Sequence, residues 1–71
     1  MEIHLEYKGT EYNGVATPYE DSILDGEPFE FKLVLDEEDK GKLKRTPSGW
    51  KSDQLEQGLA DAIGNYISEW Y

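Results

Sequence analysis

The chain has 71 residues, no cysteine, one histidine and a formal net charge of −9. This length allows one small domain, and the composition excludes disulfides, thiolate metal sites and a histidine cluster. The net charge also opposes the binding of a polyanion by the whole surface.

The longest apolar runs are only a few residues, and the N-terminus lacks the basic and apolar segments of a signal peptide. We therefore expect residues 1–71 to form a single cytoplasmic domain with no membrane partner. The Met1 start and a helix that reaches the last residues lead us to expect a complete small protein.

The N-terminal segment alternates apolar and polar residues, which predicts a half-buried strand carrying Ile3, Leu5 and Tyr7 on one face. A two-residue turn at residues 9–10 (Gly-Thr) would pair Tyr7 with Tyr12 on a returning strand. A competing register turns at residues 13–14 (Asn-Gly), the stronger type I′ signal, but leaves a short return strand before Pro18.

Residues 17–27 break the alternation with proline, Asp-Gly and scattered acids, which is typical of a connection. We expect Ile23 and Leu24 to pack under the core from this connection. The clearest strand follows, with one apolar face formed by Phe29, Phe31, Leu33 and Leu35.

Residues 36–41 (DEEDKG) predict a polar hairpin loop, and residues 42–46 predict a lysine-rich fourth strand. Residues 47–49 (Pro-Ser-Gly) then turn the chain, and we expect Trp50 to close one end of the core and Trp70 the other.

Residues 53–71 predict one amphipathic helix, because apolar residues recur at helical spacing at Leu55, Leu59, Ala62, Ile63, Tyr66, Ile67 and Trp70. Asp53 and Glu56 have the spacing of a capping box at the start of this helix. Gly58 lies near the edge of the stripe and would allow close approach of another chain segment, whereas Gly64 lies opposite the stripe. The predicted fold is therefore α+β, a four-stranded antiparallel sheet (β-β-β-β-α) with one C-terminal helix packed on one face.

Five of the seven basic residues fall between positions 40 and 51, next to an aromatic residue: Lys40, Lys42, Lys44, Arg45 and Lys51, with Trp50. Lysines on a strand can follow a phosphate backbone while a base stacks on the aromatic ring. The alternative is that these lysines only protect an edge strand from pairing and balance nearby acids.

The acidic run at residues 36–39 does not form a calcium loop, because Pro47 occupies the position where an EF-hand needs glutamate. No cofactor or metal is predicted. A catalytic triad is also not expected, because His4 is the single histidine and carboxylate pairs are too abundant to single out one.

The aromatic C-terminus is the remaining candidate for partner binding, through Ile67, Trp70 and Tyr71, which lie at the margin or beyond the end of the stripe. The alternative is that these residues only close the core.

The sequence therefore predicts a non-catalytic module that binds a protein partner or a second copy of itself, or regulates one. A weak nucleic-acid binder that uses residues 40–51 is the first alternative. An acidic nucleic-acid mimic that inhibits a DNA-binding protein is the second. Basic side chains clustered on one exposed face would favour the first alternative, whereas lysines interleaved with acids would favour protein binding or mimicry.

Overall fold

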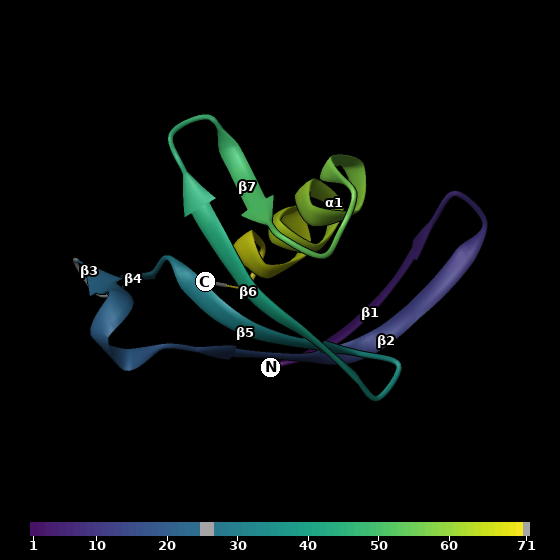
Figure 1. The fold of residues 1–71 in the computed structure, drawn as a ribbon, viewed down its shortest axis with the longest axis horizontal. Coiled ribbons are helices and arrows are strands. Elements are labelled where there is room, and N and C mark those ends of the chain that lie inside the picture. The colour runs from purple at the N-terminus through teal and green to yellow at the C-terminus, as the bar shows by residue number, and fades with distance from the viewer. Residues whose placement is uncertain (25–26, 71) are drawn as a thin grey trace.

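Five strands form one antiparallel sheet in the order β1-β2-β5-β6-β7, and helix α1 lies in the hollow of this curled sheet (Figure 1). The structure is a computed structural model that describes the backbone of residues 1–24 and 27–70, and the side chains of these residues outside positions 22–27. The sheet contains β1 (Glu2–Tyr7), β2 (Thr10–Pro18), β5 (Glu30–Leu35), β6 (Glu38–Thr46) and β7 (Gly49–Ser52). The remaining elements are a 3₁₀ turn η1 (Glu20–Ser22), the short pair β3 (Ile23–Leu24) and β4 (Glu27–Pro28), and α1 (Gln57–Ser68).

The α+β class and the single C-terminal helix are confirmed, but the main sheet has five strands rather than four. The missed strand is β7, which pairs with the end of β6 from Leu43↔Ser52 to Thr46↔Gly49. Trp50 is the single apolar residue of β7, so alternation could not reveal this strand. The predicted packing of Ile23 and Leu24 concerns side chains outside the described residues.

The first hairpin turns one residue earlier than predicted, at Lys8 and Gly9, whose φ angles are 51° and 81°. Two positive φ angles are the pattern of a type I′ turn, which suits the twist of the flanking strands. The pairing becomes Leu5↔Tyr12 and differs from the predicted register by two residues, so every side chain keeps its predicted face. The competing turn at residues 13–14 is wrong, because these residues lie inside β2.

The second hairpin also has a tighter turn than the predicted loop over residues 36–41. Asp36 and Glu37 form the turn, and β6 already begins at Glu38. The register then shifts between Lys32 and Val34, opposite Gly41, which has a φ of 74°. An extra residue at a left-handed glycine is the signature of a β-bulge, which bends the strand and increases its twist.

Helix α1 begins four residues later than predicted, and the capping box is wrong. Glu56 is the N-cap residue, and no side chain caps the helix start. Residues 53–56 instead form the connection between β7 and α1, and Leu55 of this connection packs against the core. The helix also ends earlier than predicted, at Ser68, because Glu69 is its C-cap residue and Trp70 lies in a turn; Tyr71 lies outside the described residues.

The outer edge of β7 is closed by side chains of the helix. The backbone N–H of Trp50 donates to Oδ1 of Asp61 at 3.2 Å, and Nε2 of Gln57 donates to the Trp50 carbonyl at 2.6 Å. Unpaired groups at a strand edge otherwise invite pairing with another chain. Helix α1 therefore protects this edge as well as covering the core.

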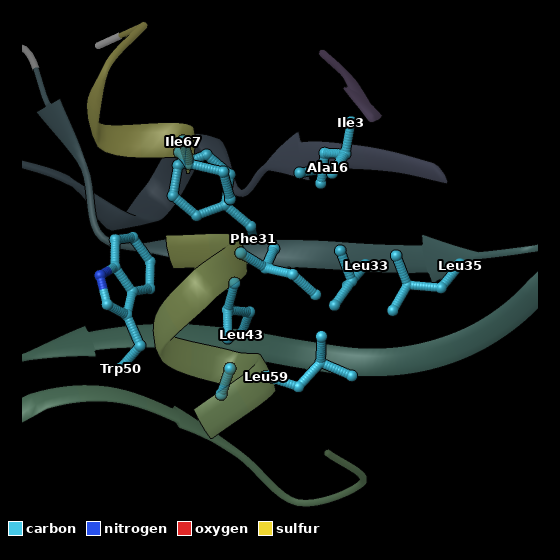
Figure 2. Close-up of a cluster of buried hydrophobic side chains, with 11 residues drawn as sticks. Ile3, Ala16, Phe31, Leu33, Leu35, Leu43, Trp50, Leu59 and Ile67 are labelled. Carbon is cyan, nitrogen blue, oxygen red and sulfur yellow. The ribbon is translucent and has the colours of Figure 1, made fainter. Parts of the chain in front are cut away.

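The core lies between the sheet and the helix and consists of Ile3, Ala16, Phe31, Leu33, Leu35, Leu43, Trp50, Leu59, Ala60, Ile63 and Ile67. Trp50 lies at one end of this cluster, beside Phe31 at 6.1 Å between ring centroids, and Leu35 lies at the other (Figure 2). The expectation that Trp50 closes one end of the core is confirmed, whereas the expectation that Trp70 closes the other end is wrong, because Trp70 is exposed.

The helix is rotated about its axis relative to the predicted stripe. Ala60 and Gly64 are buried, whereas Tyr66 is only half-buried, and the placement of Gly64 opposite the stripe was therefore wrong. The reason is Trp50, whose indole ring occupies the space where a side chain at position 64 would stand. The predicted close approach at Gly58 is confirmed, because the Tyr7 hydroxyl lies where a Cβ would be.

Candidate functional site

On the face of the sheet that points away from α1, called the outer face here, acidic and basic residues gather at opposite ends, except that Glu30 lies among the lysines. Acidic residues gather around the ends of β1 and the β5–β6 turn, whereas lysines occupy the other end of β5, β6 and β7. The strand registers place both sets on the same side, because alternate residues of paired strands share a face.

The acidic end holds a groove of about 550 Å³, called the outer groove, lined by Glu2, His4, Asn13, Gly14, Val15, Val34, Asp36 and Glu37. Val15 and Val34 are direct cross-strand partners and form an apolar floor. Val15 is 43% exposed, so this floor is accessible to solvent. Carboxylates of Glu2, Asp36 and Glu37 lie around the floor, which makes the groove suitable for a ligand with an apolar stem and a positive end.

Hydrogen bonds hold one wall of the outer groove. The Asn13 N–H donates to Oδ1 of Asp36 at 3.2 Å, and the Asp36 N–H donates to the Asn13 carbonyl at 2.7 Å. The Asn13 side chain is in turn hydrogen bonded to Nδ1 of His4 at 2.6 Å. These contacts fix the position of the Asp36 carboxylate relative to the groove.

The turn beside the outer groove has an unusual composition. Asp36 and Glu37 have φ angles of 49° and 69°, in the left-handed region that favours glycine. Aspartate tolerates this conformation well, but a type I′ turn normally carries glycine at its second position. Glu37 therefore places a carboxylate at the groove at a cost in backbone strain.

Replacing Glu37 by glycine is expected to raise the free energy of unfolding by about 0.5–1 kcal/mol, because glycine adopts this φ without strain. Urea unfolding followed by circular dichroism measures the change. The matched control is Glu38→Gly, which makes the same chemical change one residue later, inside β6. There glycine should lower stability by about 0.5–1 kcal/mol. A loss of stability in Glu37→Gly would contradict the argument.

The lysines at the opposite end of the outer face form the lysine strip, which consists of Lys32, Lys42, Lys44 and Lys51. All four side chains are exposed. A shallow depression of about 250 Å³ lies among Lys42, Lys44 and Lys51, with Ser52 and Asp53 at its border.

The residues predicted to bind nucleic acid do not form one continuous surface in the structure. Arg45 points to the inner side, where its guanidinium lies 5.0 Å from the Trp50 ring centroid and donates to Ser68 at 3.1 Å. The Trp50 ring is buried against Gly64, so it offers no face for a stacked base. Lys40 forms an ion pair with Glu38 at 2.9 Å, away from the lysine strip.

Sequence reasoning left Lys32 out of the basic set, because the window began at residue 40. A usable signal was present, since Lys32 lies on the polar side of the alternating strand over residues 29–35. Register brings it opposite Lys42, but the register could not be read from the sequence.

The residues predicted to bind a partner at the C-terminus also lie in different environments. Ile67 is fully buried and belongs to the core, because the helix is rotated toward Ala60 and Gly64. Trp70 is 67% exposed, with its ring centroid 6.5 Å from that of Tyr66. Tyr71 lies outside the described residues.

Within the part of the chain that the structure describes, no three His, Asp or Glu side chains gather closely enough to hold a metal ion. No helix among these residues is long and apolar enough to span a bilayer. Comparison with protein-family models, with curated proteins and with solved structures finds no match.

Proposed function

We propose that this protein is a cytoplasmic, non-catalytic binding module that holds a lysine or arginine side chain of a protein partner in the outer groove. The supporting observation is the combination of an accessible valine floor with three surrounding carboxylates in one groove of about 550 Å³. An aliphatic stem can cover the valines while the charged end reaches the carboxylates.

The charge of the whole molecule favours the same class of partner. A formal net charge of −9 attracts basic surfaces at long range and speeds their encounter. Two of the basic side chains predicted to bind nucleic acid are instead paired with acids, Lys40 with Glu38 and Lys42 with Glu30 at 3.4 Å.

The surroundings of His4 support binding rather than catalysis. His4 is exposed, and its ring contacts the Asn13 side chain and, at 3.9 Å, the carboxylate of Glu2. Neither partner is a nucleophile that the imidazole could activate by removing a proton. Acidic mimicry of nucleic acid is less favoured, because the lysine strip interrupts the negative surface.

The test is a titration of the ¹⁵N-labelled protein with a trilysine peptide, followed by amide chemical shifts. We expect saturable shifts centred on Gly14, Val15, Val34 and Asp36, with an affinity in about the millimolar range that weakens as salt is added. The same peptide with acetylated side chains and an acetylated N-terminus keeps the backbone and loses its positive charges, so it should produce no saturable shifts.

Two double variants each remove two negative charges, one pair at the outer groove and the other pair on η1. Asp36→Asn combined with Glu37→Gln should weaken trilysine binding about fivefold, because two carboxylates at the groove are neutralised. Glu20→Gln combined with Asp21→Asn, on η1, should change it less than twofold. Equal weakening by both pairs, or equal binding of the acetylated peptide, would refute the proposed function.

A further inference from the structure

We propose that the lysine strip is a second, separate site, which binds the phosphate backbone of single-stranded nucleic acid. The proposal goes beyond the outer groove, because it uses other residues at the opposite end of the outer face and a ligand of opposite charge. The strip crosses three adjacent strands, β5, β6 and β7 (Figure 1).

The first argument is the pairing of like charges across the strands. Lys32 lies directly opposite Lys42, and Lys44 lies directly opposite Lys51. Like charges in this relation destabilise a sheet, whereas acid and base in the same places would stabilise it. The chain has 16 acidic residues and only seven basic ones, yet it places four of the seven together. An anionic ligand would relieve this repulsion.

The second argument is that three of these lysines are available for a ligand. Lys32, Lys44 and Lys51 form no ion pair with any residue that the structure describes, and Lys44 and Lys51 border the depression of about 250 Å³. Lys42 is held by Glu30 at 3.4 Å and lies 5.2 Å from the ring centroid of Tyr19. These contacts bring an aromatic ring to the edge of the strip.

The third argument concerns the shape of the anion. Asp53 borders the strip on one side, and Glu30 lies within it opposite Lys44. A flat anionic surface such as a membrane would meet these acids together with the lysines. A single phosphate chain is narrow enough to follow the lysines alone, as in other proteins that bind single strands.

The experiment measures fluorescence anisotropy of a labelled 15-nucleotide oligothymidine with the full chain, between about 20 and 200 mM salt. Phosphate contacts by all four lysines, with Lys42 exchanging Glu30 for phosphate, predict a slope of about −2.8 in a plot of log K against log salt, and two contacts predict about −1.4. We therefore expect Lys44→Gln combined with Lys51→Gln to halve the slope. The side chains of Lys8, Lys44 and Lys51 are exposed and that of Lys40 is half-buried, and circular dichroism verifies that each variant is folded.

The matched control is Lys8→Gln combined with Lys40→Gln, which makes the same change in net charge outside the strip. This control should keep the slope near −2.8. The absence of binding at 20 mM salt, or equal slopes for the two double variants, would overturn the proposal. Equal or tighter binding of oligoglutamate or of phosphatidylserine vesicles would also overturn it. Because the trilysine titration measures a different site, either proposal can fail while the other stands.

Discussion

Replacing Gly14 by alanine is expected to lower the free energy of unfolding by about 3 kcal/mol or more. Gly14 lies in β2 between Ile3 of β1 and Leu35 of β5. A Cβ at this position would overlap the backbone carbonyl oxygen of Val34 and would come within 3.0 Å of the Leu35 side chain. A backbone oxygen cannot rotate away, so the β2–β5 pairing must open instead.

This loss is large compared with the whole stability, because a 71-residue domain has only about 4–10 kcal/mol in total. Differential scanning calorimetry should show a melting temperature lower by about 12 °C or more. The control is Gly9→Ala, where a Cβ meets nothing within 4 Å but φ is 81°. Conformational strain alone should cost about 1 kcal/mol there. A Gly14→Ala variant as stable as Gly9→Ala would contradict the steric argument.

Replacing Gly64 by alanine is expected to lower stability by about 2 kcal/mol, although alanine is the better helix former by about 1 kcal/mol. A Cβ at position 64 would overlap the Trp50 ring at its central atoms. The indole cannot move aside cheaply, because it is 5% exposed and packs on Phe31, while Gln57 and Asp61 hold the backbone of Trp50.

Two further variants test this explanation by urea unfolding. Gly58→Ala places a Cβ against the Tyr7 hydroxyl, the far end of a half-buried side chain that can rotate, so it should cost less than Gly64→Ala. In the background of Trp50→Leu, Gly64→Ala should be close to neutral, because the overlapping ring is absent. A cost of Gly64→Ala that is independent of the residue at position 50 would show that the two residues are not coupled.

The alternation and helical spacing of apolar residues in the sequence were sufficient to predict the class of fold. The alternation at Ile3, Leu5, Phe31 and Leu33 predicted the inner face of the sheet, and these residues do face the helix side. A slip of two residues in the first hairpin left this face unchanged, because side chains alternate with a period of two. The error in register therefore had no consequence for the core.

The periodicity of the sequence did not predict contacts in which a residue without a side chain leaves space for a side chain from another element. Nothing in the helical periodicity indicates that Gly64 faces the core, because glycine has no side chain to mark a face. Trp50 decides it, since its indole fills the space between β7 and the helix. The same rotation buries Ile67, which the sequence placed at the margin of the apolar stripe.

The two proposed sites depend on strand register to different degrees. The acidic turn at Asp36 and Glu37 is visible in the sequence as a charge run, but its proximity to Glu2 requires β1, β2 and β5 to lie side by side. The lysine strip requires Lys32 and Lys42 to be opposite each other, which the bulge at Gly41 sets.

Composition and periodicity alone determined that this chain forms a small acidic α+β domain with one amphipathic helix, because burial of apolar residues follows the periods of the strand and the helix. The tertiary structure decided which residues meet: Trp50 with Gly64, Lys32 with Lys42, and Glu2 with Asp36 across one groove. The reason is that a period specifies the face on which a residue lies, whereas register, twist and helix rotation specify its neighbours. Function at a surface depends on those neighbours.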